Sequence, residues 1–280
     1  MDRRQRLIEI FEDTEELYRQ SPKLVHAVEA AKSATRLYEA DDYSGALIPP
    51  DTDCSISVSK HKSFEAALQI QKEHPGWRIA VLNFASATNP GGGVKTGSSA
   101  QEECLCRCST LYPTLTQDWL WRDYYKKNRD ARDPLYTDAC IYSPGIVICK
   151  TDESFPERMK EKEWITVDVI SCAAPNLRRR PGYYHNPKQN AAITISPESL
   201  YQLHLKRGKH ILHIAAAHRI DAVVLGAFGC GAFANPAAIV ARAYKDLIAE
   251  YKKYFRMIEY AIYCRPDETE NYDVFKKVLG

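Results

Sequence analysis

The chain has 280 residues, of which 45% are hydrophobic and 26% charged, and its formal net charge is +2. This length can bury a large core, and the near-neutral charge argues against a general nucleic-acid-binding tail. No apolar run reaches the roughly 18 to 20 residues that cross a bilayer. The charged segment 1–6 lacks the apolar core of a signal peptide, and nine scattered cysteines suit reduced thiols. We therefore expect a cytoplasmic protein with no membrane partner.

The hydrophobic pattern predicts a helical lead followed by alternating strands and helices. Apolar residues at helical spacing predict helices over 2–20, 24–40, 63–73, 98–109, 197–218 and 236–254. Short apolar runs predict buried strands over 78–84, 145–150, 165–170, 222–225 and 259–264. Strands that alternate with helices of this length predict a three-layer α/β/α sandwich.

The domain organisation is expected to be simple. The sequence contains no internal repeat and no low-complexity linker. We expect one structural unit, in which residues 1–60 form an N-terminal helical extension packed on a catalytic core of residues 61–280. The lack of a long heptad or repeat pattern favours a monomer.

A glycine run and a glutamate pair lie close together after the strand expected at 78–84. Asn89-Pro-Gly-Gly-Gly93 follows that strand, and Gln101-Glu102-Glu103 comes seven residues later. Glycines tolerate positive φ and let the backbone approach a ligand closely, and in open α/β sheets ligands bind at the carboxyl ends of the strands. Two glutamates at the start of a helix can supply one proton-transferring group and one hydroxyl-binding group. These features predict a hydrolase that acts on a nucleotide sugar.

A second glycine-rich loop, Gly226-Ala-Phe-Gly-Cys-Gly-Ala-Phe-Ala-Asn235, joins the strand at 222–225 to the next helix. Backbone N–H groups in such a loop can converge on an anion, helped by the positive end of the helix. Neither loop carries the lysine and hydroxyl residue of a mononucleotide phosphate loop, and the dinucleotide fingerprint is incomplete. Each loop alone fits a tight turn equally well. Together they could hold one diphosphate from both sides.

The two motifs together resemble the signature of the poly(ADP-ribose) glycohydrolases, and the second loop is similar to that of the bacterial-type branch. The resemblance extends from the N-terminal helices through Ser171-Cys-Ala-Ala-Pro-Asn176 to the last helix. It implies a macrodomain, with a mixed, mostly parallel sheet between helices and ADP-ribose bound across the strand ends. It also implies hydrolysis of the 1″–2′ ribose–ribose bonds of poly(ADP-ribose), mainly at chain ends, with weak action on the last unit attached to a protein.

The resemblance implies that Glu103 is the catalytic acid/base and that Glu102 holds ribose hydroxyls on either side of the scissile bond. Such a bond breaks through an oxocarbenium-like transition state, in which the leaving oxygen is protonated and a water is then deprotonated. One glutamate can perform both steps when burial or a like charge raises its pKa. Adjacent helical side chains point roughly 100° apart, which favours one catalyst and one positioning residue.

The resemblance also implies the substrate contacts. Asn89 would hydrogen-bond the reacting ribose, and Phe233 would stack on it. The backbone positions implied to contact the ribose or the diphosphate are Gly91, Gly92, Gly93, Gly229, Cys230, Gly231 and Ala232. Gln101 is assigned to the substrate-binding set as a hypothesis, with hydrogen bonds to backbone or loop groups. Asn235 is expected to cap the following helix rather than to touch the ligand.

Several other residues could suggest different chemistry. The cysteines at 104, 106 and 108 cannot share one face of a helix, so a zinc site is disfavoured and no metal or cofactor is expected. The histidines between 204 and 218 fit structural roles. The arginines at 178–180 could meet the phosphates of the polymer or form a solvated basic loop. The aromatic residues at 183–185 could stack on adenine or pack.

Two other functions stay open at the level of sequence. One is a macrodomain that binds ADP-ribose or its polymer without cleavage, although such a reader has no need of the second glutamate in Gln101-Glu102-Glu103. The other is a hydrolase for mono-ADP-ribosyl linkages, which would also need Glu103. In the preferred interpretation, the partners are poly(ADP-ribose) or poly(ADP-ribosyl)ated proteins as substrate and ADP-ribose as product, with no sequence-specific nucleic acid.

Overall fold

The computed structural model describes residues 2–178 and 193–280. Within them, seven strands form one sheet in the order β1-β4-β5-β3-β6-β7-β2. The strands are Arg36–Tyr38 (β1), Ser55–Ser59 (β2), Ile79–Phe84 (β3), Cys140–Ile148 (β4), Ile165–Cys172 (β5), Ala222–Leu225 (β6) and Met257–Ala261 (β7). The neighbours from β5 to β2 run parallel, whereas β4 is antiparallel to β1 and β5. The mixed, mostly parallel sheet is confirmed.

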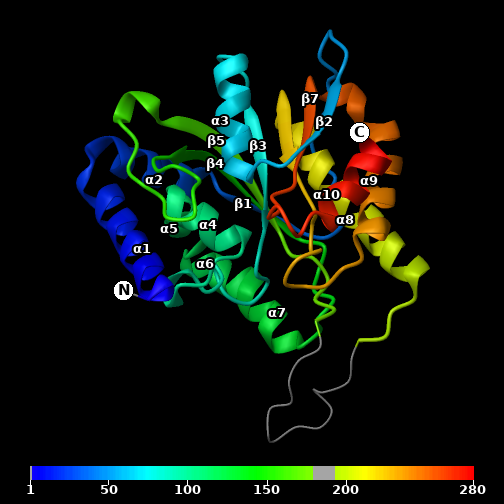
Figure 1. The fold of residues 1–280 in the computed structure, drawn as a ribbon, viewed down its shortest axis with the longest axis horizontal. Helices are drawn as coiled ribbons and strands as arrows, with labels where there is room; N and C mark the ends of the chain where they lie inside the picture. Colours follow the sequence, from blue (N-terminus) through cyan, green and yellow to red (C-terminus); the bar gives the residue numbers. More distant parts are fainter. Residues whose placement is uncertain (1, 179–192) are drawn as a thin grey trace, which may run out of the picture.

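Helices cover both faces of the sheet. The helices are Arg3–Gln20 (α1), Pro22–Ala34 (α2), Ser63–Glu73 (α3), Gln101–Cys108 (α4), Leu111–Leu115 (α5), Asp118–Leu120 (α6), Lys126–Ala131 (α7), Pro197–Ala217 (α8), Ala237–Tyr251 (α9) and Glu270–Leu279 (α10). One face is covered by α3, α4 and α5, with α1 outside them, and the other by α8, α9 and α10 (Figure 1). The three-layer α/β/α prediction is confirmed.

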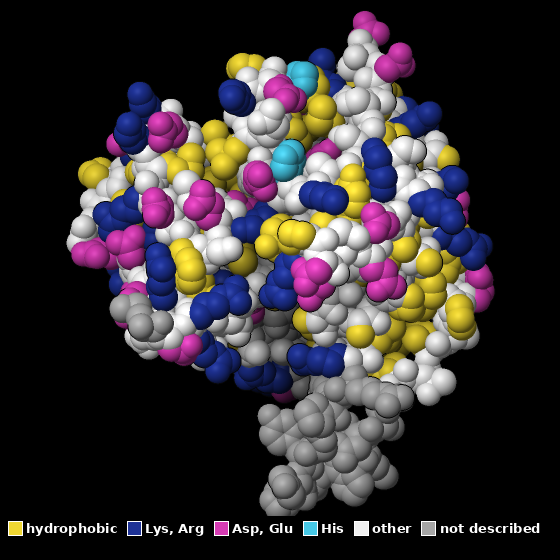
Figure 2. Space-filling view, in the orientation of Figure 1, with side chains coloured by type: hydrophobic (Ala, Val, Ile, Leu, Met, Phe, Trp, Pro, Cys, Tyr) yellow, Lys and Arg dark blue, Asp and Glu magenta, His cyan; other side chains and the backbone are white. Residues whose placement is uncertain are grey.

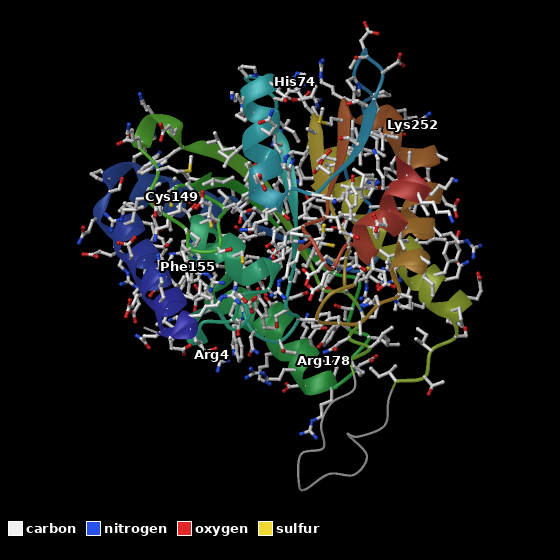
Figure 3. The ribbon with its side chains drawn as sticks, in the orientation of Figure 1. Arg4, His74, Cys149, Phe155, Arg178 and Lys252 are labelled. Atoms are coloured by element: carbon white, nitrogen blue, oxygen red, sulfur yellow. The ribbon has the colours of Figure 1, made fainter. Side chains whose placement is uncertain are left out.

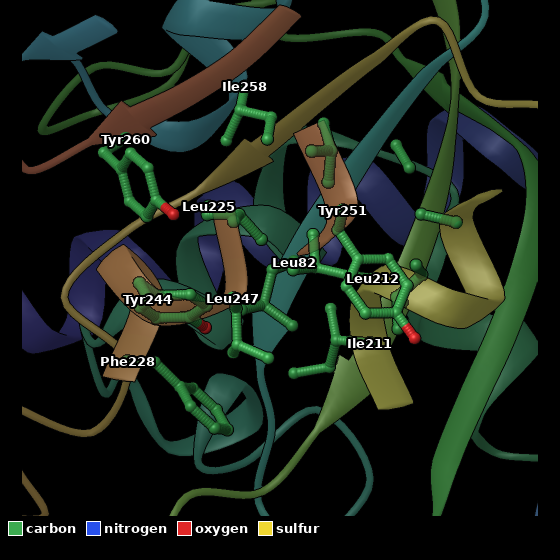
Figure 4. Close-up of a cluster of buried hydrophobic side chains, with 14 of the residues drawn as sticks. Leu82, Ile211, Leu212, Leu225, Phe228, Tyr244, Leu247, Tyr251, Ile258 and Tyr260 are labelled. Carbon is green, nitrogen blue, oxygen red and sulfur yellow. The ribbon is translucent and has the colours of Figure 1, made fainter. Parts of the chain in front are cut away.

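The core explains why the strands read as unbroken apolar runs. Leu82, Leu225 and Ile258 point to one side, where they join Ile211 of α8 and Tyr244 of α9 in a buried cluster (Figure 4). The alternate residues of β3 and β6 point to the other side and pack with α3 and α4. Because both faces of the central strands are buried, both sets of alternate positions are mainly apolar. The buried Asn83 of β3 is an exception, and its side chain is hydrogen-bonded.

Most predicted elements are present with their ends shifted by a few residues, but the second helix is shorter than predicted. It was expected over 24–40, and it ends at Ala34 because Thr35 adopts an extended conformation. The next three residues form β1, in which Arg36 pairs with Tyr142 of β4. Pairing at the edge of the sheet therefore outweighs the local helical pattern.

The sequence prediction missed β2 and placed the start of β4 too late in the chain. β2 was not predicted, because its alternating Ser-Ile-Ser-Val-Ser sequence is short and half-exposed. β4 begins at Cys140, five residues before the expected strand at 145–150. A register shift between Ser143 and Ile146 interrupts the β4–β5 pairing, and Gly145 has a φ of 72° there. Because this bulge interrupts the strand, the sequence pattern did not reveal its first half.

The first 60 residues contribute to the sheet as well as to the helical lead. β1 and β2 both lie in this part and form the two edges of the sheet. Leu24 and Val28 of α2 pack against Val147 of β4. The division into 1–60 and 61–280 stays a prediction. No helix in the described ranges has both the length and the apolar character required to cross a membrane.

Candidate active site

The parallel strands bring the two glycine loops to the same edge of the sheet. β3 ends at Phe84 beside Cys172 of β5, and β6 lies on its other side. The loop after β3 and the loop after β6 therefore leave the sheet as neighbours. The second loop packs against the end of β3, where the ring of Phe228 lies 5.8 Å from the ring of Phe84 between centroids. A Cβ on Gly226 would lie 2.7 Å from the carbonyl oxygen of Ala261 and 2.9 Å from Phe84 Cζ, so only glycine fits at this approach.

The first loop packs its backbone against the glutamate pair. Gly91 and Gly92 adopt the left-handed conformation, with φ of 70° and 60°. A Cβ on Gly92 would overlap Glu103 Oε1 and would lie 3.2 Å from Glu102 Oε2. Glycine is therefore required at position 92 both for its conformation and for the close approach to the two carboxylates.

The two carboxylate oxygens of Glu103 differ, because one accepts a hydrogen bond and the other does not. The N–H of Gly93 donates to Oε1 at 2.8 Å. Oε2 has no hydrogen-bond partner among the described residues, although the side chain is only 7% exposed. A buried carboxylate oxygen without a partner is costly for stability, so it is typical of a group that acts on a ligand.

Glu102 is held differently, because both of its oxygens accept hydrogen bonds from the protein. Asn83 Nδ2 donates to Oε1 at 3.3 Å, and the N–H of Ser86 donates to Oε2 at 2.8 Å. Burial raises the pKa of Glu102 to about 8, and the like charge of Glu103 acts in the same direction. The hydrogen bonds from Ser86 and Asn83 oppose this shift.

Gln101 connects α4 to the strand that precedes the glycine loop. Its Oε1 accepts the N–H of Phe84 at 2.9 Å, while its Nε2 donates to the carbonyl of Leu82 at 2.8 Å and to Ser63 Oγ at 3.0 Å. The side-chain amide thus binds β3 and the start of α3. This connection sets the position of the first turn of α4, which carries both glutamates.

Asn89 lies at the exposed start of the glycine loop. Its N–H donates to Ser86 Oγ at 3.1 Å, and its side-chain oxygen accepts a hydrogen bond from Arg129 Nη2 of α7. The side-chain amide nitrogen of Asn89 is then left as the donor for a ligand. Arg129 was missed in the sequence, because it stands 40 positions away in no recognisable motif.

Asn235 is not a helix cap, so this prediction is wrong. α9 begins at Ala237, and its N-cap residue is Pro236. The Asn235 side chain is 3% exposed, and its Nδ2 donates to the carbonyls of Pro175 at 2.7 Å and Gly229 at 3.0 Å. The buried amide binds the loop after β5 to the loop after β6, which is a tertiary role that a cap pattern does not reveal.

A histidine of α8 completes this connection. His204 Nε2 lies 2.9 Å from Asn235 Oδ1. Burial lowers the pKa of His204 to about 4, so the ring is neutral near neutral pH and donates to the amide oxygen. The structural role expected for the histidines of this helix agrees with that geometry.

The rest of the second loop presents backbone and one aromatic ring to the surface. Gly231 and Ala232 are exposed, and Gly229 is buried with a φ of 79°. The N–H of Cys230 already donates to the carbonyl of Ala227 at 3.0 Å, and burial raises the pKa of its thiol to about 12. The half-buried Phe233 ring lies 6.2 Å from the ring of Tyr136.

Comparison with known proteins identifies the family. The family model described as microbial-type PARG, catalytic domain, matches residues 7–151, which is just over half of the chain. The chain belongs to this family. No curated protein sequence matches it.

Solved structures of the family resemble the whole chain. The poly(ADP-ribose) glycohydrolase from Thermomonospora curvata is 28% identical with a TM-score of 0.82, and the match covers 98% of this chain and 99% of that chain. The same enzyme bound to the inhibitor ADP-HPD gives a TM-score of 0.80 at 28% identity, with 98% and 99% coverage. The Deinococcus radiodurans enzyme, in complex with ADP-ribose, is 30% identical with a TM-score of 0.70, over 89% of this chain and 96% of that chain.

Lys and Arg side chains gather around a hollow in the lower part of the face drawn in Figure 2. Arg178 is exposed at the lower edge of the molecule (Figure 3), and its N–H donates to Asn176 Oδ1 at 3.3 Å. The other predicted polymer contacts, at 179–180 and 183–185, lie outside the described residues.

The cysteines near the glutamates do not form a metal site within the described ranges. Cys106 and Cys108 are buried and Cys104 is partly exposed on α4, and burial raises the pKa of each thiol. Across residues 2–178 and 193–280, no group of three or more His, Cys, Asp or Glu side chains could hold a metal ion.

Proposed function

We propose that this protein hydrolyses the 1″–2′ ribose–ribose bonds of poly(ADP-ribose) and releases ADP-ribose. The observation that carries the proposal is the Glu103 carboxylate. It is buried beside the first glycine loop, with one oxygen held by Gly93 and the other without a partner in the described structure. The relatives that contain ADP-ribose or the inhibitor ADP-HPD are poly(ADP-ribose) glycohydrolases, which supports the same substrate class here.

In this proposal the terminal ADP-ribose lies across the edge of the sheet. Gly229, Gly231 and Ala232 offer backbone N–H groups to the diphosphate, and the Gly91–Gly93 backbone borders the reacting ribose. Cys230 would have to exchange its bond to Ala227 before its own N–H could contribute. Phe233 stacks on the ribose, and Asn89 donates its side-chain amide to a ribose hydroxyl. No cofactor is required.

Glu103 acts first as the acid and then as the base. Its Oε2 gives a proton to the 2′-oxygen of the preceding unit as the C1″–O2′ bond breaks, leaving an oxocarbenium-like ribose. A water then attacks C1″ and returns its proton to Oε2. The net reaction adds a hydroxyl to C1″ and a hydrogen to O2′, and the carboxyl group is regenerated.

Glu102 and Gln101 have supporting roles in this mechanism. The bonds from Asn83 and Ser86 hold the Glu102 carboxyl group in one orientation, and each oxygen keeps a second acceptor site for ribose hydroxyls. Because the Gln101 amide is engaged with β3 and α3, we infer that it positions the glutamates and does not contact the substrate.

Three finer points belong to the proposal. Cleavage occurs mainly at chain ends and is weak at the protein-linked unit, which rests on the resemblance to the bacterial-type branch. The protein acts as a monomer on poly(ADP-ribosyl)ated proteins. It works in a reducing cytoplasm, in agreement with nine cysteines that are all free thiols. Product lengths from polymers of defined length test the first point, and light scattering of the purified protein tests the second.

The decisive experiment uses automodified poly(ADP-ribose) polymerase as substrate and measures the ADP-ribose released by the wild type and Glu103→Gln. We expect the variant to turn over at least about a hundredfold more slowly while its ADP-ribose affinity stays within about tenfold. Glu12→Gln, on an exposed position of α1, is the matched control and should behave as the wild type. An active Glu103→Gln would show that another group is the catalyst.

Two further outcomes separate the alternatives. Tight ADP-ribose binding without release of ADP-ribose by the wild type would indicate a reader or a hydrolase for mono-ADP-ribosyl linkages, which a panel of mono-ADP-ribosylated substrates would distinguish. A chelator should leave the activity intact. Activity that is lost with the chelator and restored by a divalent metal would indicate a metal-dependent ADP-ribosyl hydrolase instead.

A further inference from the structure

An arginine and a tryptophan lie together beside the glycine loop, and neither is among the residues proposed above to bind the terminal ADP-ribose. The guanidinium carbon of Arg129 is 4.9 Å from the centroid of the Trp121 ring. Arg129 also donates to the side-chain oxygen of Asn89, the residue proposed to bind the reacting ribose. The Trp121 side chain is 37% exposed. Just over a third of the tryptophan is therefore open to solvent next to a guanidinium group.

The local structure holds Trp121 in this exposed position. Trp121 begins a π-helical turn, Trp121–Tyr125, between α6 and α7. Tyr124 and Tyr125 of the same turn are buried, and the rings of Trp121 and Tyr125 are stacked with centroids 6.5 Å apart. The buried tyrosines anchor the turn while the tryptophan faces outward. π-helical turns are rare and occur frequently at functional sites.

The segment that carries this pair borders the ribose end of the proposed ligand. Arg129 contacts Asn89 of the first loop. A few residues further along the same segment, the ring of Tyr136 lies 6.2 Å from the ring of Phe233 in the second loop. Asn89 and Phe233 are the two side chains proposed to hold the reacting ribose. Because the next unit of the polymer is attached at that ribose, it must leave the site near this segment.

The charge of Arg129 is available to a ligand. Two neighbouring cations on α7 are paired, since Lys126 contacts Asp130 and Lys127 lies 3.5 Å from Glu39. Arg129 has no carboxylate partner among the residues that the structure describes; its contacts are the neutral Asn89 and the Trp121 ring. A guanidinium group binds phosphate through paired N–H donors, and an exposed aromatic ring stacks on a base.

We propose that Trp121 and Arg129 form a subsite for the second unit of the polymer, the one whose 2′-oxygen is the leaving group. Trp121 stacks on the adenine of that unit, and Arg129 binds its diphosphate. This inference rests on the proposed function and extends it. The subsite contacts only the leaving part of the substrate, so it increases the specificity for polymer without increasing the affinity for the product ADP-ribose.

The test compares two substrates that share the ADP-ribosyl group and differ in the leaving group. One is poly(ADP-ribose) of defined length, and the other is ADP-ribose joined at C1″ to a small phenol. For Trp121→Ala and for Arg129→Gln we expect kcat/KM on the polymer to fall about fivefold or more, the scale of one lost stacking contact. On the phenol substrate, kcat/KM should stay within about threefold, as should the Kd for ADP-ribose, because Arg129 loses only one exposed hydrogen bond to Asn89.

Arg122→Gln is the matched control. Arg122 is an exposed arginine of the same turn, but it pairs with Asp123 at 2.7 Å, and among the described residues it makes no hydrogen bond or ion pair with the glycine loop. The Arg122→Gln variant should keep the wild-type kcat/KM on both substrates. Arg129→Lys should recover part of the polymer activity, because the positive charge remains.

Three results would overturn the inference. Equal losses on both substrates would mean that Arg129 and Trp121 act on the reacting ribose itself. Unchanged polymer activity in both variants would show that Trp121 and Arg129 form no subsite. An equal loss of polymer activity in Arg122→Gln would show that the effect comes from positive charge in general and not from Arg129. Failure of the proposed function looks different, because the wild type would then not cleave the polymer. In that case the affinities of Glu103→Gln for polymer and for ADP-ribose, with and without Arg129→Gln, still test the subsite.

Discussion

The backbone N–H of Gly93 donates to Glu103 Oε1 at 2.8 Å, and this bond links the glycine loop to the proposed catalytic carboxylate. The loop proposed to border the reacting ribose and the group proposed to protonate its leaving oxygen are therefore positioned by one contact. A change in the loop moves Glu103, and the free oxygen of Glu103 is oriented by the loop. Geometry of this kind matters in catalysis, because a misplacement of about 1 Å can cost a hundredfold in rate.

Gly92→Ala should abolish most of the activity. The new Cβ would overlap Glu103 Oε1 and crowd Glu102, and the φ of 60° would become strained. We expect a loss of stability of about 1–2 kcal/mol from the left-handed conformation and a loss of turnover of at least about a hundredfold from the displaced carboxylate. Thermal unfolding and polymer hydrolysis measure the two effects separately.

Gly76→Ala separates backbone strain from displacement of the glutamate. Gly76 has a φ of 90°, and a Cβ there would meet no atom within 4 Å. This control should lose a similar amount of stability and keep its activity. Equal activity in Gly92→Ala and Gly76→Ala would contradict the assigned contact between the loop and the catalytic group.

Phe233→Ala should lower turnover and ligand affinity together. The ring is half-buried next to Tyr136 and is proposed to stack on the reacting ribose. Its removal should reduce kcat/KM about tenfold or more, the effect of roughly 1.4 kcal/mol. Phe233→Tyr keeps the ring and should retain most of the activity. Wild-type kinetics and wild-type ADP-ribose affinity in the alanine variant would exclude Phe233 from the site.

Asn235→Ala should weaken ADP-ribose binding and destabilise the protein. The substitution leaves the carbonyl of Pro175 without its buried donor and His204 without its acceptor. The carbonyl of Gly229 loses one of its two donors, because the backbone N–H of residue 235 remains. Unsatisfied buried groups cost about 1–3 kcal/mol, and the released loop no longer holds its N–H groups on the diphosphate. Calorimetric titration with ADP-ribose and thermal unfolding would show both effects.

Thr35→Val is the control for Asn235→Ala. It removes a buried hydrogen bond of 2.7 Å to the carbonyl of Ala31 at the end of α2, with almost no change of shape. This control should lose stability but bind ADP-ribose as the wild type does. If Asn235→Ala also binds normally, the connection between the two loops does not position the diphosphate.

Glu102→Gln should stabilise the protein more at pH 8 than at pH 5. Burial raises the pKa of Glu102 from its ordinary value of 4.5 to about 8 in the folded state. The folded protein therefore keeps a proton that the unfolded chain releases, and wild-type stability falls as the pH rises from about 4.5 through about 8. Glutamine carries no such proton, so the variant escapes this loss.

The expected signal is an increase in the Tm difference between Glu102→Gln and wild type of about 2 °C or more from pH 5 to pH 8, the effect of roughly 1 kcal/mol in a domain of this size. Glu12→Gln, exposed on α1, should show no such trend. A constant difference across this pH range would mean that Glu102 is ionised in the folded protein at both pH values.

The elements that could be read from the sequence share one physical property. β3, β5 and β6 are largely buried on both faces, so most of their residues are apolar and the strands are easily recognised. β1 and β2 are the edge strands, where one face and one edge need no apolar cover. Their short sequences carry no such pattern, and β1 even continues the helical spacing of α2. Only pairing with β4 identifies it as a strand.

For the proposed site, the sequence by itself determined which residues carry the chemistry and the backbone freedom, namely Glu102 and Glu103 and the glycines at 91–93. Their order along the chain sets their proximity, because a strand, a loop and a helix follow one another directly. What the tertiary structure decided is the difference between the two glutamates and the contacts made across the fold. Asn83 and Ser86 donate hydrogen bonds to the Glu102 carboxyl group, and Arg129 of α7 donates a hydrogen bond to Asn89. Such hydrogen bonds join positions that only folding brings within reach, so no local pattern could have revealed them.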